Sequence, residues 1–157
     1  GDRYQKCLLS DKLIKPVRIR AGKCVIKLLE LTESGREKLK EIGYEVSGSL
    51  RHGGVEHLYW LNYAKKKIEK AGYNVKEEYP IGNGETVDLA IIGKRKKIAI
   101  EIETGKSDAI HNIRKCLDAG FEVVSLATNQ ETLEKIKSKL GYFTESKFEN
   151  VRLQYLH

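Results

Sequence analysis

Residues 86–103, TVDLAIIGKRKKIAIEIE, hold the two segments with the strongest β-propensity in the chain. The first seven and the last seven residues of this stretch are rich in apolar, β-branched side chains, and Gly93-Lys94-Arg95-Lys96 separates them as a turn-like sequence. We expect the two segments to pair as an antiparallel hairpin centred on this turn. The register then places Asp88 opposite Glu101, whether the loop has two residues or four.

Three carboxylates should converge on one face of this hairpin. Side chains alternate between faces along a strand, so the opposed Asp88 and Glu101 share a face, with Cβ atoms about 5 Å apart. Glu103 lies two residues further along the same face. Because opposed like charges destabilise a sheet and the neighbours are apolar, these acids need a neutralising partner. That partner is either a hard divalent cation such as Mg²⁺ or Mn²⁺, or Lys and Arg side chains of neighbouring elements.

Upstream of the hairpin, the sequence predicts one long helix and a further strand. Apolar residues at helical spacing cover residues 55–71, and Gly72 ends the pattern. Residues 75–79 alternate like a half-buried strand, and Gly82-Asn83-Gly84 after them is a strong turn signal. This strand should therefore join the sheet of the hairpin.

Downstream, helical and apolar segments alternate. Ser107 can cap a helix that ends at about residue 119. The nearly continuous apolar segment 123–127 predicts a buried parallel strand, followed by a helix over 130–140 and an edge strand over 151–155. The order predicts an α/β fold in which helices flank a mixed central β-sheet.

The N-terminal part of the chain predicts a smaller unit. Residues 14–20 and 24–31 form a hairpin pattern with a short basic turn, and Thr32 can cap a following helix. The Gly- and Ser-bearing segment 46–50 marks a domain boundary. It divides the chain into residues 1–47 and residues 48–157.

Composition favours a polyanionic partner. The 157 residues carry a formal net charge of +7, and the basic residues are spread along the chain, although basic surfaces also keep proteins soluble. The three cysteines are widely spaced, which argues against a disulfide framework and a zinc site. No apolar run has the length of a membrane span and no signal-peptide pattern opens the sequence, so we expect a cytoplasmic, intracellular protein without a membrane partner.

The hairpin acids and their context resemble the PD-(D/E)XK nuclease superfamily, which includes restriction-endonuclease-like enzymes and archaeal Holliday-junction resolvases. In that superfamily, a helix bearing a glutamate precedes a hairpin with a metal-binding Asp and Glu, and a helix, a parallel strand and another helix follow. Here Asp88 and Glu101-Ile102-Glu103 match the signature, and Glu56-His57 match the first helix. The resemblance covers residues 51–140 and implies a metal-dependent DNA nuclease.

The sequence departs from the superfamily at one position. Most members have lysine where this chain has Glu103, although some restriction enzymes of the superfamily carry glutamate there and still cleave DNA. Lys106, at the approach to the next helix, is either a replacement for that positive charge or a surface lysine.

The resemblance also implies roles for individual residues. Asp88, Glu101, the carbonyl of Ile102 and, directly or through water, Glu56 would hold Mg²⁺ or Mn²⁺, unless Glu56 is only a first-turn acid that complements its helix dipole. Glu103 or Lys106 would orient the attacking water, and the product would carry a 5′-phosphate. Basic or polar residues on the flanking elements are the candidates for DNA contacts: Arg51, His52, His57, Lys65, His111, Asn112 and Arg114.

The N-terminal hairpin and helix resemble the back half of a winged-helix domain, whose recognition helix would lie at or before residues 4–13. Nuclease-like domains beside winged helices and ATPase domains occur in archaeal proteins. This resemblance implies an ATPase or translocase as a partner, and superfamily members that cut both strands often form homodimers.

Two other functions remain open. A nuclease-like module could bind DNA or dock a partner ATPase without cutting, which is consistent with the absent lysine. A metal-dependent hydrolase of small phosphoesters is the other, although the sequence has few signs of a closed small-molecule pocket.

Overall fold

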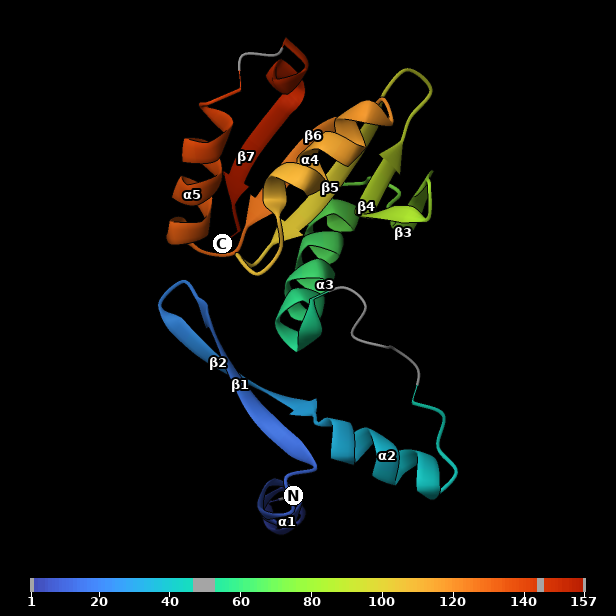
Figure 1. The fold of residues 1–157 in the computed structure, drawn as a ribbon, viewed down its shortest axis with the longest axis vertical. Helices are drawn as coiled ribbons and strands as arrows, with labels where there is room; N and C mark the ends of the chain where they lie inside the picture. The colour runs from blue at the N-terminus through green and yellow to red at the C-terminus, as the bar shows by residue number, and fades with distance from the viewer. Residues whose placement is uncertain (1, 47–52, 144–145, 157) are drawn as a thin grey trace. The chain divides into compact units, whose positions relative to one another are not determined.

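The chain forms two compact units, which are Gly1–Glu56 (unit 1) and His57–His157 (unit 2). Each unit has its own sheet (Figure 1). The sequence prediction placed the boundary between residues 47 and 48, and that point lies outside the described residues. The structure, a computed structural model, describes residues 2–46, 53–143 and 146–156.

Unit 1 contains the predicted hairpin and helix. The strands pair antiparallel in a register that runs from Ile14 opposite Leu31 to Ala21 opposite Cys24, so the basic turn is as predicted. Thr32 caps the following helix, because its Oγ1 accepts a hydrogen bond of 3.1 Å from the Gly35 N–H. The elements are α1 (Asp2–Ser10), β1 (Ile14–Ala21), β2 (Cys24–Leu31) and α2 (Glu33–Glu41).

Unit 2 is built on a mixed five-stranded sheet in the order β3-β4-β5-β6-β7. The first three strands are antiparallel, whereas β6 and β7 each run parallel to the preceding strand of the sheet. The predicted α/β class with a mixed sheet packed with helices is therefore confirmed. The elements are α3 (Gly54–Lys70), whose first three residues belong to unit 1, β3 (Lys76–Gly82), β4 (Glu85–Ile92), β5 (Lys97–Glu103), α4 (Ala109–Asp118), β6 (Glu122–Ala127), α5 (Gln130–Leu140), η1 (Ser146–Asn150) and β7 (Val151–Tyr155).

The two faces of the sheet are covered by different helices. Helix α4 contacts the face that carries Glu101, through Cys116, and α5 shares the apolar core of that face. Helix α3 lines a cavity with Ile98 and Ile100, which alternate with Glu101 and so point to the other face. The acidic positions of β5 are thus under α4, with α3 on the far side of the sheet.

The register of the central hairpin matches the prediction. The β4–β5 ladder runs from Ile92 opposite Lys97 to Leu89 opposite Ile100. Continued by one residue, it places Asp88 opposite Glu101. The described ladder stops before that pair, so the backbones are no longer joined by ladder hydrogen bonds where the acids lie.

The start of α4 differs from the prediction. Ser107 was expected to cap the helix, but the N-cap is Asp108, whose carboxylate accepts hydrogen bonds from the N–H groups of Ile110 and His111. Both residues can cap, and a carboxylate complements the positive end of the helix better than a hydroxyl does. Ser107 is thereby left to bond with Glu103.

Among the described residues, every helix is too short or too polar to cross a lipid bilayer.

Candidate functional site

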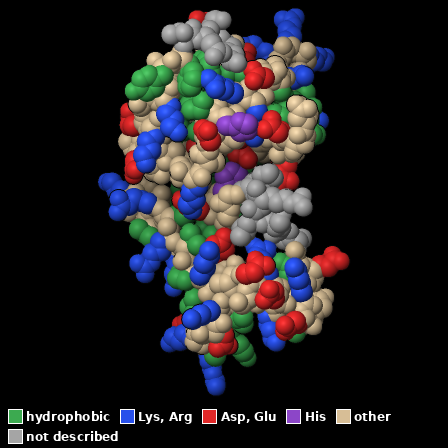
Figure 2. Space-filling model, in the orientation of Figure 1, with side chains coloured by type: hydrophobic (Ala, Val, Ile, Leu, Met, Phe, Trp, Pro, Cys, Tyr) green, Lys and Arg blue, Asp and Glu red, His purple; other side chains and the backbone are tan. Residues whose placement is uncertain are grey.

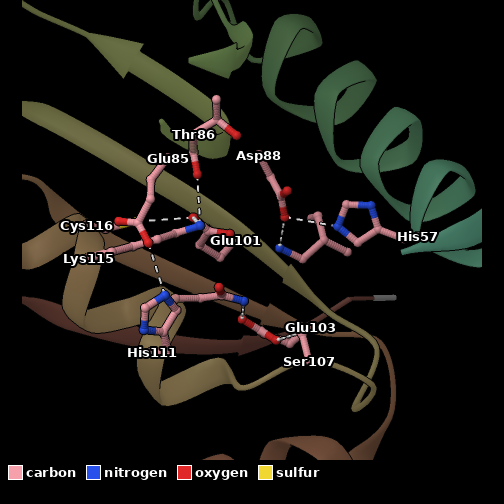
Figure 3. A network of polar contacts seen from close by, with 12 residues as sticks. His57, Glu85, Thr86, Asp88, Glu101, Glu103, Ser107, His111, Lys115 and Cys116 are labelled. Carbon is pink, nitrogen blue, oxygen red and sulfur yellow. Dashed lines mark hydrogen bonds and ion pairs between the residues drawn. The ribbon is translucent and has the colours of Figure 1, made fainter. Parts of the chain in front are cut away.

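Asp88, Glu101 and Glu103 lie in one polar network between β4, β5 and α4 (Figure 3). Glu101 is 2% exposed and Glu103 is 0% exposed, so both are among the most buried side chains of the unit. Acidic side chains of this kind are rarely buried without a partner. The contacts of each acid therefore decide what the network can do.

Asp88 takes the place of a backbone acceptor at the end of the β4–β5 ladder. Its Oδ2 accepts the Ile102 N–H at 2.8 Å and lies 3.0 Å from Nε2 of His57 on α3. Burial raises the pKa of Asp88, but the hydrogen bond and charge of His57, together with the Ile102 N–H, hold it below its usual value. Asp88 is therefore a carboxylate at neutral pH, and the proton that it shares with His57 is on Nε2.

The pKa of Glu101 is shifted in the opposite direction. Burial, followed by the negative charge of Asp88, raises its pKa to about 8, and the Lys115 ammonium only partly offsets this. Its Oε1 accepts a hydrogen bond of 3.1 Å from the Cys116 thiol and lies 3.5 Å from Lys115 Nζ. Ser125 stands beside Glu101 on β6, with a buried hydroxyl that has no hydrogen-bond partner among the described residues.

Glu103 is held by α4 and the loop that precedes it. Its carboxylate oxygens accept hydrogen bonds from Asn112 Nδ2 at 3.2 Å and from Ser107 Oγ at 3.0 Å. Burial raises the pKa of Glu103, and these two donors only partly offset it. The side chain is thus buried with a donor on each carboxylate oxygen, and it supplies no positive charge to the network.

Lys115 also contacts the network, although the sequence did not single it out. Its Nζ donates a 2.8 Å hydrogen bond to the carbonyl of Thr86, which is paired across the β3–β4 ladder with Pro80. Proline has no N–H to donate, so this carbonyl needs another donor. The ammonium supplies it and is thereby held 3.5 Å from Glu101. In the sequence, a proline at position 80 of a predicted strand indicates that one carbonyl of the neighbouring strand lacks a donor. Identifying Lys115 as that donor requires the register of β3 with β4 and the rotation of α4 about its axis.

On α3, His57 rather than its neighbour Glu56 contacts Asp88. Successive helical residues are about 100° apart, so Glu56 points in a different direction. His57 is buried, and its second ring nitrogen, Nδ1, has no hydrogen-bond partner in the described part of the chain. The helix residue that meets the acids is therefore one position after the glutamate singled out from the sequence.

The remaining candidate residues occupy varied positions. His111 is exposed and lies 3.1 Å from Glu85. Arg114 stacks over the Phe143 ring at 4.3 Å. Lys65 pairs with Glu77 and Glu69, Lys106 is exposed in the β5–α4 loop, and Arg51 and His52 lie outside the described residues.

Asp88 and Glu101 are the residues of this network that could hold a hard cation. Asp88 Oδ1 and Glu101 Oε2 accept no hydrogen bond from the described residues, and each is an oxygen of the type that Mg²⁺ and Mn²⁺ prefer. The charge of Asp88 raises the pKa of Glu101, so a cation near both would relieve repulsion. Within residues 2–46, 53–143 and 146–156, no group of three or more His, Cys, Asp or Glu side chains is arranged to hold a metal ion.

A cavity of about 360 Å³ lies on the opposite face of the sheet and is not part of this network. Ala64 and Ile68 of α3 line it together with Ile98 and Ile100 of β5. Its walls are mostly apolar, so the cavity has few polar groups that could bind or activate a substrate. The acidic network under α4 is the better candidate for a reaction site.

No protein-family model, curated protein or solved structure matches this chain. The site must therefore be interpreted from its own residues and their contacts.

The raised pKa of Glu101 predicts a specific dependence of stability on pH. In the unfolded chain this carboxyl ionises near 4.5, whereas in the folded chain it ionises at about 8. Between these values the unfolded state has lost a proton that the folded state keeps, so the free energy of unfolding falls as pH rises. Glu101→Gln removes this dependence. Urea denaturation in EDTA from pH 5 to pH 8 should show the variant gaining stability relative to the wild type, by up to a few kcal/mol.

The exposed Glu131 provides the matched control. Lys135 lowers its pKa, so it is ionised in both states throughout this pH range. Glu131→Gln should therefore track the wild type from pH 5 to pH 8. Parallel curves for Glu101→Gln and the wild type would show that Glu101 titrates normally.

Proposed function

We propose that unit 2 is a metal-dependent DNA nuclease with a restriction-endonuclease-like fold, and that unit 1 is a partial winged-helix domain. The single observation that carries the proposal is the set of three acids on one face of the β4–β5 hairpin, of which Glu101 and Glu103 are buried and in which burial and the charge of Asp88 raise the pKa of Glu101. Folded proteins seldom keep such repulsion in a core without a use for it. The order of strands and helices in unit 2 supports the fold, since it matches the pattern of that superfamily.

Asp88 and Glu101 are the residues that would hold Mg²⁺ or Mn²⁺, with the Ile102 carbonyl as a further candidate. The bound cation would supply a water of lowered pKa and neutralise charge that develops on the phosphate. His57 keeps Asp88 ionised and oriented, and Cys116 and Lys115 orient Glu101. Glu103, whose carboxylate oxygens accept hydrogen bonds from Asn112 and Ser107, would be the acceptor of a hydrogen bond from the attacking water.

Lys115 is the preferred source of the positive charge that Glu103 does not supply. Its side chain is 14% exposed and its ammonium is fixed by two contacts, to Thr86 and to Glu101. Lys106 is exposed in a loop. A cation that is already oriented needs little reorganisation when negative charge develops on a phosphate, which favours Lys115 for this role.

The direct test is cleavage of plasmid, linear duplex, single-stranded and junction DNA with Mg²⁺, Mn²⁺ or EDTA. The wild type should cut at least one substrate with either metal and none in EDTA. Asp88→Asn and Glu101→Gln should lose cleavage and retain DNA binding, because each keeps the side-chain shape but weakens the cation site. Glu131→Gln should cleave like the wild type. Cleavage that survives in EDTA, or in both site variants, would contradict the proposal.

A matched pair of lysine variants tests the source of the positive charge. Lys115→Gln should lower kcat by about a hundredfold with a smaller change in KM. The substitution removes a positive charge that would stabilise the negative charge of the transition state. Lys106→Gln should change kcat by less than about threefold. The reverse result would assign the role to Lys106. Circular dichroism and thermal melting should accompany both variants, since Lys115 also bonds to Thr86.

The second candidate function is a module that binds DNA, or docks an ATPase or translocase, without cutting. It is favoured by the contacts of the acids, since each already has at least one protein donor, and by Glu103 in the position of the usual lysine. Under this function the wild type binds DNA, no metal yields cleavage, and Asp88→Asn leaves binding unchanged. The cleavage experiment therefore separates the two functions. A homodimer that cuts both strands remains part of the first proposal.

A further inference from the structure

The turn between β4 and β5 carries four consecutive cations, Lys94, Arg95, Lys96 and Lys97. All four are exposed, and they line a depression of about 260 Å³ together with Gly120 and Glu122, where the chain passes from α4 into β6. Lys and Arg side chains project at this end of unit 2 (Figure 2). Like charges so close together repel one another, so the turn is a concentrated positive patch.

Two of the four cations have partners within the protein. Lys96 Nζ lies 2.6 Å from Glu122 of β6, and Lys97 lies over the Phe121 ring at 5.8 Å from its centre. These contacts attach the base of the turn to the start of β6. Their role in unit 2 is therefore structural.

Lys94 and Arg95, at the tip, differ from them. Neither makes a hydrogen bond, an ion pair or a ring contact with any residue in the described part of the chain. The tip thus presents two adjacent charges to solvent on a base that is held in place. Because the base is held, the backbone of the turn need not be ordered when the tip meets an external anion.

The turn is rigidly connected to the acidic network. Asp88 and Lys94 are six residues apart on the same hairpin, which corresponds to about 20 Å at 3.3 Å per residue. Helix α4 spans the same interval, because its first residues follow the loop that contacts Glu103 and its last residue precedes the depression beside the turn. The patch and the acids therefore lie toward opposite ends of one helix.

We propose that Lys94 and Arg95 form a second contact site for the phosphate backbone of a nucleic acid, about 20 Å from the acidic network. The inference rests on the proposed function, because that function places the reacting phosphate at the acids. A duplex that runs from the acids along α4 to the turn would span about six base pairs at 3.4 Å each. The substrate is then a polymer that extends at least this far to one side of the cut, which excludes mononucleotides and other small phosphoesters.

The test is the salt dependence of DNA binding, measured in EDTA so that no cleavage can occur. The affinity of the full chain for a 24-base-pair fluorescent duplex is measured by anisotropy from 50 to 300 mM KCl. In Lys94→Gln/Arg95→Gln, the slope of log K against log[KCl] should become shallower by about 1.8, which is about 0.9 for each phosphate that the variant no longer neutralises. The affinity at 100 mM KCl should fall by about tenfold or more.

The matched control is Lys66→Gln/Lys70→Gln, which removes the same charge from exposed positions on α3. Its slope should stay within about 0.5 of the wild-type slope. An unchanged slope in the turn variant, an equal change in both variants, or no DNA binding by the wild type would each overturn the inference. Failure of the proposed function has a different signature, which is a wild type that binds DNA with the turn-dependent slope but does not cut it with Mg²⁺ or Mn²⁺.

Discussion

The end of the β4–β5 ladder is the feature on which the rest of unit 2 depends. The two strands are joined up to Leu89 and Ile100, and at the next position the side chain of Asp88, not a backbone carbonyl, accepts the Ile102 N–H. This brings a carboxylate into the sheet beside Glu101. His57 and the Ile102 N–H hold the pKa of Asp88 below its usual value, whereas burial, followed by the negative charge of Asp88, raises the pKa of Glu101. At neutral pH the site therefore contains one ionised carboxylate, Asp88, and one protonated carboxyl group, Glu101.

The surrounding elements position these two groups. His57 reaches Asp88 from α3, and α4 supplies Lys115 and Cys116 to Glu101. Pro80 acts at a distance from the acids, because its missing N–H leaves the Thr86 carbonyl to Lys115. A proline in β3 thereby helps to fix a cation on α4. This link between a strand and a helix gives the network one positive charge that is oriented before any substrate binds.

Much of the fold could be predicted because it depends on local patterns. The register of the central hairpin follows from the symmetry of two β-rich segments about residues 93–96, and the pairs from Ile92 opposite Lys97 to Leu89 opposite Ile100 keep it. The features that could not be predicted depend on how each helix is rotated about its axis and on which of two adjacent residues takes a given role. Ser107 and Asp108 can both cap α4, and Glu56 and His57 differ by one position on α3. Lys115 was missed because its role depends on which carbonyl a proline leaves without a donor, and this requires the pairing of β3 with β4.

We propose that a divalent cation replaces the proton on Glu101 and is shared with Asp88. Isothermal titration calorimetry with Mn²⁺, performed at pH 7 in buffers of different ionisation enthalpy, measures both the binding and the protons released. With the pKa of Glu101 at about 8, binding to the wild type should release close to one proton at pH 7, and far less at pH 9. Asp88→Asn should weaken the binding by at least about tenfold. Binding without proton release, or no Mn²⁺ binding to the wild type, would contradict the account.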